Sequence, residues 1–442
     1  MTQSEYQRRR AQLMKLMAPG AIAVLPSSHV QYRNRDTEHL FRQNSDFYYL
    51  TGFDEPNAVL VLAPGREHGE VILFCQERDE AHERWTGERM GTERATQMLG
   101  VDDAFPIGDI GDILPGLLEG CERIYANLGE HADFDRDLLG WVQGIRAHQV
   151  HGAMPPGEFI VLSHLLHDLR LYKSAAELKL MRRAARITAD AHIRAMRTAR
   201  PGGSEAELEA EIVHEFMKNG ARFPAYPCIV GAGRNACVMH YVRNDAPLKD
   251  GDLVLIDAGC EYQYYAADVS RTFPVNGRYA GPQRALYEVV LDAQLAAIDA
   301  VRAGNAFDQP HTVAIRRMVE GLVDLKLLAG DVDELIADES YKKYCVHKSS
   351  HWLGLDVHDV GDYRVDDAWR TLEPGMVLTV EPGIYCSDDD SVPAAFRGIG
   401  IRIEDDVLVT RDSPDVLTVA APKAIDEIEA LMRDAASARG AR

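Results

Sequence analysis

The chain has 442 residues, of which 46% are hydrophobic, and its 48 basic against 69 acidic side chains give a formal net charge of −21 at pH 7. A chain of this length predicts two to three domains with a sizeable core. An acidic surface repels phosphate groups and anionic headgroups, so we expect no nucleic-acid and no membrane partner. The longest clean apolar run, residues 58–63, is far shorter than the roughly 20 residues of a membrane-spanning helix.

The cysteines and the N-terminal residues both indicate the cellular compartment. The chain has seven cysteines, an odd number, and no C-x-x-C pair. In a chain this long we expect them to be reduced and mostly buried, which predicts a cytoplasmic protein. The basic residues Arg8 to Arg10 imitate the start of a signal peptide, but Lys15 and Pro19 interrupt the apolar stretch that follows. We therefore expect no signal peptide.

The first part of the chain alternates short apolar runs with helical segments. Strand patterns occupy residues 69–75 and 123–127, and a helical pattern lies between them at 92–99. This alternation predicts a smaller α/β domain over residues 1–172. Near residue 173 the pattern changes to longer helical segments, and we place a second domain over residues 173–442.

The second domain begins with long helical patterns. Two capping boxes, Ser174 to Glu177 and Ser204 to Glu207, start helices that end at the glycines of 201–203 and at Gly220. A third helix is expected between Pro282 and Gly304. Strand patterns lie between and after these helices. Together they predict an α+β domain in which helices flank an antiparallel sheet.

Asp257 and Asp268 lie in the segment IDAGCEYQYYAADVSRTF, inside strand patterns where a solvated turn would suit an acid better. Their midpoint falls near Tyr262 and Gln263, so an antiparallel hairpin centred there brings the two carboxylates face to face. Two carboxylates so placed need a cation or a shared proton. When such a pair of aspartates occurs alone, it more often consists of two exposed acids in turns.

Two further carboxylates follow. Glu381 precedes Pro382, which favours extended backbone, and Glu404 lies in the strand pattern GIGIRIEDDVLVT. The isoleucines of that pattern share one face, so Arg402 and Glu404 share the other. An arginine in this place suits a residue that orients a metal ligand. A surface ion pair is the commoner meaning of an isolated R-x-E.

Three histidines, His347, His351 and His358, fall within twelve residues. One of them could be a ligand, with the others acting as acid, base or oxyanion partner near neutral pH. In a regular strand His351 and His358 lie on opposite faces unless Gly354 marks a bulge, so spacing alone does not make both of them ligands of one ion. Each histidine taken singly is more often structural.

The four carboxylates and at least one histidine form a hard, oxygen-rich site. Four negative charges offset two divalent cations, which favours a dinuclear centre of manganese, cobalt or zinc type over a single ion. Such a centre supplies a nucleophile at neutral pH and clamps both sides of a hydrolytic attack.

These motifs, in this order and spacing, closely resemble those of the aminopeptidase P family. They are IDAG, ADVSRTF, HWLGLDVHDVG, VLTVEPG and GIRIEDD. The segment FRQNSDFYYLTGFDEPNAVLVL, residues 41–62, resembles the N-terminal domain of the same family, so the resemblance covers essentially the whole chain. It implies for the second domain the pita-bread fold that this family shares with prolidase, creatinase and methionine aminopeptidase.

The resemblance also implies which residues act. Two metal ions, usually manganese in this family, with cobalt or zinc as alternatives, are bound by Asp257, Asp268, His351, Glu381 and Glu404, and Asp268 and Glu404 bridge them. The implied catalytic residues are His240 beside the substrate, His347 and His358 at the scissile carbonyl and the proline side, Glu381 as proton acceptor, and Arg402 as a partner of ligands and substrate. Trp85 and Asp36 are implied to reach the site of a neighbouring subunit. Tyr226 and Tyr385 are our candidates for the walls around a prolyl nitrogen, which carries no N–H.

The implied activity is that of a metal-dependent exopeptidase. It releases the N-terminal residue from peptides with proline in second position, through attack of a metal-bridging hydroxide on the X-Pro bond. The resemblance further implies a homodimer or homotetramer, and no cofactor besides the metals.

Three other functions compete with this one. Prolidase cuts only dipeptides and shares all five ligands. A pita-bread binding module without catalysis, or a creatinase-like hydrolase without metal, is disfavoured because all five ligand positions are filled. The chain departs from the family at Lys348 and Ser349, where a small residue and then an apolar one are usual.

Overall fold

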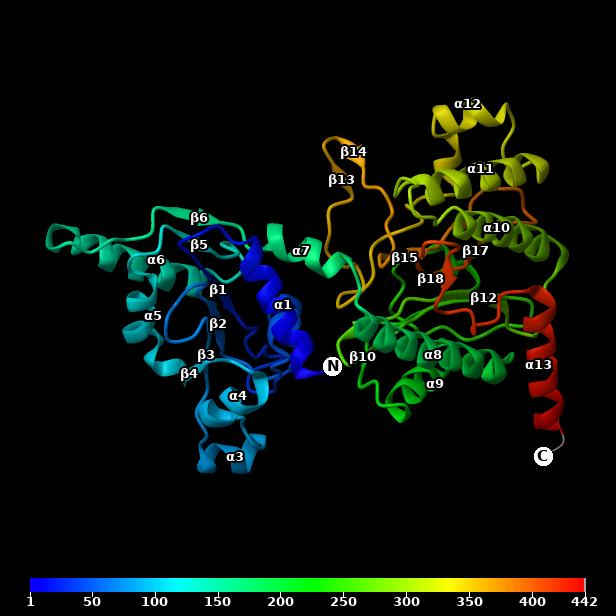
Figure 1. Ribbon diagram of the computed structural model, residues 1–442. Helices are drawn as coiled ribbons and strands as arrows, with labels where there is room; N and C mark the ends of the chain where they lie inside the picture. The colour runs from blue at the N-terminus through cyan, green and yellow to red at the C-terminus, as the bar shows by residue number, and fades with distance from the viewer. Residues whose placement is uncertain (441–442) are drawn as a thin grey trace. The chain divides into compact units, whose positions relative to one another are not determined.

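The computed structural model describes residues 1–440. The chain divides into two compact units, Met1–Arg170 and a second unit that begins at Leu171. The α/β character of the first unit and the α+β character of the second are as predicted (Figure 1). No helix among residues 1–440 combines the length and apolar character needed to span a membrane.

The first unit is built on a mixed sheet of six strands in the order β4-β3-β2-β1-β5-β6. The β1–β2 and β2–β3 pairs are antiparallel, and the β3–β4, β1–β5 and β5–β6 pairs are parallel. The strands are β1 (Ala21–Pro26), β2 (Val59–Leu62), β3 (Val71–Cys75), β4 (Asp103–Pro106), β5 (Arg123–Tyr125) and β6 (Glu158–Ile160). The helices are α1 (Gln3–Leu16), α2 (Ser45–Thr51), α3 (Glu80–Thr86), α4 (Gly91–Leu99), α5 (Ile110–Leu118), α6 (Ala132–Ala147) and α7 (Ser163–Leu171).

The core of this sheet lies under α5 and α6. Apolar side chains of β1, β2 and β3 pack there against Leu114 and Leu118 of α5 and Leu138 and Val142 of α6. Every residue of β1 is buried, as befits a central strand.

The second unit contains longer helices and short antiparallel strands. The helices are α8 (Ala175–Thr198), α9 (Glu205–Lys218), α10 (Gly281–Asp299), α11 (Gln309–Asp324), α12 (Val332–Ala337) and α13 (Ile425–Gly440). The predicted capping box is present at α8, since Ser174 Oγ accepts from the Glu177 amide at 3.4 Å and the Glu177 carboxylate accepts from the Ser174 amide at 2.9 Å. It fixes where this helix begins.

The strands of this unit form several small sheets rather than one. They are β7 (Phe223–Pro224), β8 (Ile229–Ala232), β9 (Leu253–Asp257), β10 (Cys260–Tyr262), β11 (Tyr265–Ala266), β12 (Ser270–Pro274), β13 (Arg364–Val365), β14 (Ala368–Trp369), β15 (Val377–Val380), β16 (Gly383–Cys386), β17 (Ile399–Arg402), β18 (Asp405–Leu408) and β19 (Asp415–Val416). The sheet orders are β11-β10-β7, β12-β9-β8, β15-β18-β19, β16-β17 and β13-β14. Helices α8 and α9 contact the first two of these sheets, and α10 contacts β15, β16 and β17 (Figure 1).

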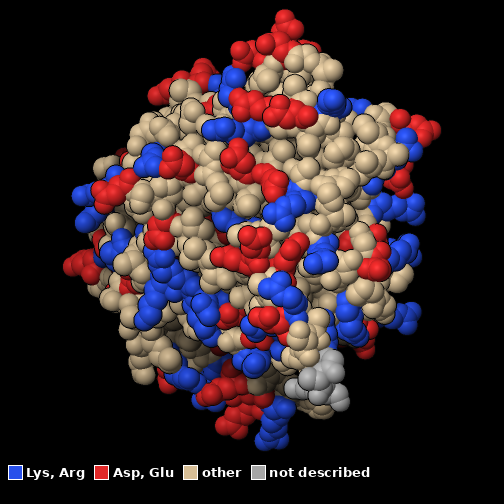
Figure 2. All heavy atoms as spheres, turned by 90° about the vertical axis from the view of Figure 1, so that its right-hand side faces the viewer, with Lys and Arg blue, Asp and Glu red and all other residues tan. Residues whose placement is uncertain are grey.

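Charged side chains of both signs are interspersed over the face of the molecule in Figure 2. The excess of acids over bases in the sequence is therefore accompanied by many surface cations on this face. Such mixing of charges favours solubility.

His192 of α8 is buried beneath the strands. Its Nε2 donates to the Ala258 carbonyl at 3.0 Å, and its Nδ1 has no hydrogen-bond partner within residues 1–440. Burial lowers the pKa of His192 to about 4. The imidazole is therefore held neutral between α8 and the turn that follows β9.

We expect His192 to make the folded protein less stable in mild acid. Its pKa is about 4 when folded and about 6.5 when unfolded, so the unfolded chain binds more protons between these values and stability falls as the pH falls through this window. At pH 5 the loss relative to pH 8 is about 2 kcal/mol. Urea unfolding of metal-free wild type and His192→Gln at both pH values checks this, because other titrations cancel in the difference. Equal losses in the two proteins would contradict it.

Candidate metal centre

The hairpin predicted around Tyr262 and Gln263 is confirmed. Tyr262 pairs with Tyr265 across a two-residue turn, and Gln263 and Tyr264 adopt the positive φ angles, 49° and 73°, that such a turn requires. Further along the same hairpin, β9 pairs with β12. Asp257 ends β9 and Asp268 precedes β12, so both acids lie at one end of this strand pair.

Gly259 allows the two halves of the hairpin to approach closely. A Cβ atom at this position would lie only 1.6 Å from the carbonyl oxygen of Ala267. A side chain here would force Asp257 and Asp268 apart. The hydroxyl of Tyr226 lies 2.5 Å from Asp257 Oδ1 and also hydrogen-bonds with Asp268 Oδ1, so one hydroxyl contacts both carboxylates.

Glu381 and Glu404 come from a second pair of strands. β15 pairs with β18, with Val380 opposite Asp405, so Glu381 directly after β15 and Glu404 directly before β18 lie at one end of the pair. The Ser270 hydroxyl donates to Glu404 Oε2 at 2.7 Å. This contact joins the second strand pair to the first.

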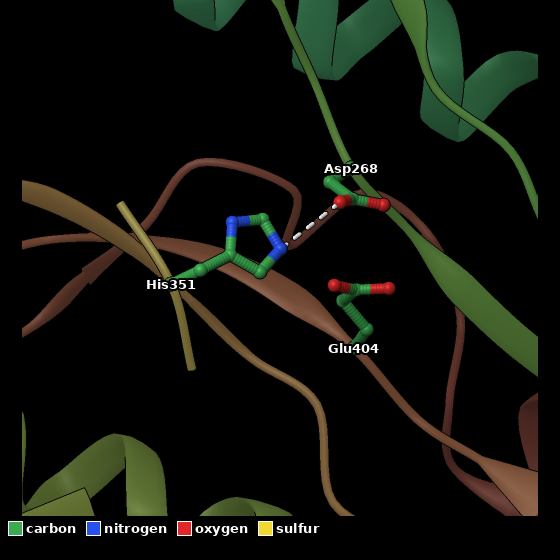
Figure 3. A group of neighbouring side chains, drawn as sticks. All are labelled: Asp268, His351 and Glu404. Atoms are coloured by element: carbon green, nitrogen blue, oxygen red, sulfur yellow. Dashed lines mark ion pairs between the residues drawn. The ribbon is translucent and has the colours of Figure 1, made fainter. Parts of the chain in front are cut away.

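His351 lies between these carboxylates. Its Nδ1 donates to the Trp352 carbonyl at 2.9 Å, which turns Nε2 toward the carboxylates, where a cation could replace the Nε2 proton. Nε2 lies 3.4 Å from Asp268 Oδ2 and 3.7 Å from Glu381 Oε1. Asp268, His351 and Glu404 each offer one ligand atom, and these atoms lie within 4.8 Å of one another (Figure 3). The cluster therefore has the size and donor types of a metal site.

The protonation of this cluster also fits a cation. Burial raises the pKa of Glu381 to about 7, and burial with the nearby carboxylates raises the pKa of Asp257 and Glu404. Burial alone would lower the pKa of His351, but Asp268 and Glu381 raise it to about 9. The carboxylates of this cluster therefore repel one another. Bound protons reduce this repulsion in part, and divalent cations would reduce it further.

Arg402 links the ligands to a histidine through a tyrosine. Its Nη2 donates to Asp257 Oδ2 at 2.6 Å, its Nε donates to Ser270 Oγ at 2.8 Å, and its Nη1 donates to the Tyr385 hydroxyl at 2.8 Å. That hydroxyl lies 2.8 Å from His347 Nε2, while His347 Nδ1 donates to the Lys348 carbonyl at 2.9 Å. Burial, with the charge of Arg402, lowers the pKa of His347 to about 4, so its Nε2 accepts from Tyr385.

The cluster opens into a cavity of about 890 Å³. His240, His347 and His358 lie on its wall, as do all five residues that the sequence suggested as ligands. Another part of the wall is apolar and contains Ile229, Met239, Val242 and Val357. The cavity therefore joins an acidic site to an apolar surface.

Comparison with known proteins matches both units. The family model of metallopeptidase family M24 matches residues 179–411, and that of the aminopeptidase P N-terminal domain matches residues 6–125. The Xaa-Pro aminopeptidase of Escherichia coli (strain K12) is 46% identical over 98% of each chain, and the human Xaa-Pro aminopeptidase 3 is 36% identical over 98% of this chain and 87% of its own.

Solved structures give the same result. An aminopeptidase from Pseudomonas aeruginosa is 57% identical, with a TM-score of 0.98 over 99% of each chain. Zinc-substituted Escherichia coli aminopeptidase P in complex with product is 46% identical, with a TM-score of 0.96 over 98% of this chain and 99% of its own. The chain belongs to the aminopeptidase P family of M24 metallopeptidases. The pita-bread fold expected from the sequence is confirmed.

In this aminopeptidase P family member residues 351–358 do not form the regular strand that would place His351 and His358 on opposite faces. Their rings meet edge to face with centroids 4.4 Å apart. The intervening residues form a loop that folds back, since the Asp359 amide donates to the Trp352 carbonyl at 2.9 Å. A buried ion pair between Lys173 Nζ and Asp359 Oδ2, 2.9 Å long, stabilises this loop.

Four suggested substrate residues lie in different places. Tyr226 lines the cavity, but its hydroxyl contacts Asp257 and Asp268. Tyr385 is buried, 4% exposed, behind the cavity wall. Asp36 and Trp85 belong to the first unit, where both are exposed and Trp85 is 89% exposed.

Two residues that support the ligands were missed from the sequence. Ser270 contacts both Glu404 and Arg402, and the Asp406 carboxylate accepts the Asp268 amide at 3.2 Å. Both lie inside motifs that carry the family resemblance, ADVSRTF and GIRIEDD. Their place in these motifs was the available signal, but no spacing rule gives their partners.

Proposed function

We propose that the protein releases the N-terminal residue from peptides with proline in second position. The observation that carries this proposal is the convergence of Asp268, His351 and Glu404 within 4.8 Å at a cavity, in a chain of the aminopeptidase P family. A variant of the Escherichia coli enzyme, 45% identical, has been solved in complex with substrate. That relative supports a peptide as the partner here.

We propose that two divalent ions, manganese in preference to cobalt or zinc, occupy the cluster. The residues that would hold them are Asp257, Asp268, His351, Glu381 and Glu404, with Asp268 and Glu404 shared between the ions. Such ions polarise a carbonyl and lower the pKa of water when bound. The four carboxylates supply the charge that two ions need.

The remaining residues orient the substrate and move protons. Glu381 accepts the proton of the attacking water. His347 is held in one orientation at the cavity wall by Tyr385 and the Lys348 carbonyl, which supports the role we assign to it at the scissile carbonyl. His358 and His240 also line the cavity. From there His358 would contact the proline side and His240 would lie beside the substrate. Arg402 holds Asp257 in place and keeps Tyr385 as a donor to His347.

Proline is recognised by the absence of an N–H. A pyrrolidine ring needs an apolar surface rather than a hydrogen-bond acceptor, and Ile229, Met239, Val242 and Val357 provide that surface. The positively charged amino end of the peptide is drawn to the acidic cluster. These two requirements together select an X-Pro N-terminus.

We propose a homodimer or homotetramer in the cytoplasm, with residues 1–172 serving assembly and residues 173–442 catalysis. The exposed indole of Trp85 in the first unit supports this, because large exposed aromatic side chains are typical of interfaces. Trp85 and Asp36 would then reach the cavity of a neighbouring subunit. The free thiols of all seven cysteines suit a reducing compartment.

Metal depletion tests the proposal. After chelation and dialysis we expect cleavage of Ala-Pro-Ala to fall by at least about 10³-fold, and Mn²⁺ to restore it with two ions bound per chain. Ala-Pro and Ala-Ala-Ala serve as controls. Cleavage of Ala-Pro alone would favour prolidase, and full activity in the metal-free protein would overturn the proposal.

A further inference from the structure

Lys348 introduces an isolated positive charge into an acidic cavity. Besides Arg402, it is the one Lys or Arg among the described residues that line the cavity. Arg402 is fully engaged with Asp257, Ser270 and Tyr385. Lys348 is exposed, and within residues 1–440 its ammonium has no carboxylate within ion-pair distance. The cavity thus has a cation available for a ligand.

The β13–β14 hairpin fixes where this ammonium lies. Lys348 Nζ lies 4.7 Å from the centroid of the Trp369 indole, which is within the range of a cation–π contact. The Arg364 guanidinium lies 5.2 Å from the same ring, and it too has no ion-pair partner among the described residues. Trp369 in turn packs against Phe307, with ring centroids 6.2 Å apart. An indole anchored in this way holds the ammonium of Lys348, a residue that lines the cavity.

Lys348 also lies close to the reacting end of the cavity along the chain. It directly follows His347, whose Nδ1 is 3.6 Å from Glu381 Oε2 and donates to the Lys348 carbonyl. The acidic cluster and Lys348 therefore line one cavity and carry opposite charges. A short zwitterionic peptide likewise carries opposite charges, a positive amino end and a negative carboxyl end.

We infer that Lys348 binds the terminal carboxylate of tripeptide substrates and so makes this enzyme favour short peptides with a free carboxyl end. The inference rests on the proposed function and concerns the same cavity. The amino end of the peptide meets the acidic cluster, proline meets the apolar wall, and the carboxylate of the third residue pairs with Lys348. A longer or amidated peptide lacks that charge at that place and gains nothing from the lysine.

The test compares Ala-Pro-Ala with Ala-Pro-Ala amide. An ion pair in a solvated cavity contributes up to about 1 kcal/mol, so we expect the metal-loaded wild type to cleave the free acid with a kcat/KM about fivefold higher, through KM. In Lys348→Met the ratio of acid to amide is expected to fall to about one, and in Lys348→Glu to below one. Salt at 0.5 M, a concentration that screens charges beyond about 4 Å, should lower the ratio in the wild type.

Lys343→Met is the matched control. The Lys343 ammonium also lies over an aromatic ring, 5.1 Å from that of Tyr344, but it donates to the Ser391 carbonyl and does not line the cavity. The Lys343→Met variant should keep the acid-to-amide ratio of kcat/KM that the wild type has. Equal kcat/KM for acid and amide in the wild type, or an unchanged ratio in Lys348→Met, would overturn the inference. A metal-loaded wild type that cleaves neither peptide would instead refute the proposed function.

Ala-Pro-Glu amide distinguishes the terminal carboxylate from a side-chain carboxylate. If Lys348 selects a glutamate side chain, this peptide is cleaved better than Ala-Pro-Ala amide and the difference disappears in Lys348→Met. That result would overturn the assignment to the terminal carboxylate. Equal rates for the two amides, together with a faster free acid, support it.

Discussion

Replacing Glu404 with glutamine is expected to lower kcat/KM for Ala-Pro-Ala by at least about 10⁴-fold, a loss of about 5.5 kcal/mol of transition-state stabilisation. Glu404 is 1% exposed, and its ligand atom lies within 4.8 Å of those of Asp268 and His351. Glutamine keeps the shape but removes one of the four negative charges that would offset the two proposed cations. Metal analysis of the purified variant should find fewer ions per chain than in the wild type.

The variant should nevertheless fold. In the presence of chelator we expect Glu404→Gln to melt at a temperature no lower than that of the wild type, because burial and the nearby carboxylates raise the pKa of Glu404 and so favour its neutral form. Glu288→Gln on the exposed face of α10, where Glu288 pairs with Arg284 at 2.9 Å, is a control that should retain activity within about twofold. A Glu404→Gln protein with its full metal content and a loss of less than about tenfold would refute the ligand role.

Replacing Arg271 with methionine is expected to lower the free energy of unfolding by about 3–5 kcal/mol. The guanidinium is fully buried, and it pairs with Asp405 at 2.8 Å. It also donates to the backbone carbonyls of Ser270, Glu404, Ala421 and Pro422. Its loss removes a donor from each of these carbonyls and leaves the buried Asp405 carboxylate with Lys423 as its remaining cation, at 2.6 Å. Urea unfolding of the metal-free protein, followed by tryptophan fluorescence, measures the change.

Asp405 is the partner that makes Arg271 costly to remove. Burial would raise the pKa of Asp405, but the charges of Arg271 and Lys423 lower it to about 2. The double variant Arg271→Met/Asp405→Asn is expected to lose about 1–3 kcal/mol less than the sum of the two single losses. Strict additivity, or a loss below about 1 kcal/mol for Arg271→Met alone, would show that the pair does not stabilise the fold.

Local patterns predicted the elements whose causes are local. The capping box at Ser174 and the turn at Gln263 and Tyr264 depend on residues within a few positions of one another, and both lie where the sequence placed them. The course of the loop after His351 does not depend on local residues. Its course depends on the pairing of Asp359 with Lys173, which are 186 positions apart, and a strand pattern contains no information about such a contact.

The residues of the metal centre also divide into those that local sequence patterns indicate and those that only tertiary contacts reveal. Carboxylates inside apolar strand patterns pointed to Asp257, Asp268 and Glu404 because an acid there is costly unless it is neutralised. The residues that orient them act across strands, as Ser270 does on Glu404 and Arg402 does on Asp257. Strand register decides those contacts, and register depends on the pairing of distant segments. Strand parity and the family resemblance both pointed to Arg402 as a partner of a ligand, but neither showed that the ligand it contacts is Asp257.

The residues of the metal centre are distributed along the chain so that Asp257 and Asp268 come first, while Glu381 and Glu404 lie near the end of its 442 residues. β18, which positions Glu404, pairs with β15 and β19, and Arg271 ties it to residues 421 and 422. A ribosome makes the chain from the N-terminus. The cluster therefore cannot close until the residues up to 422 have left the ribosome, and a chain that stops before Glu404 lacks one of the ligand residues. The order of synthesis thus makes the closing of the cluster one of the last events in the folding of this unit.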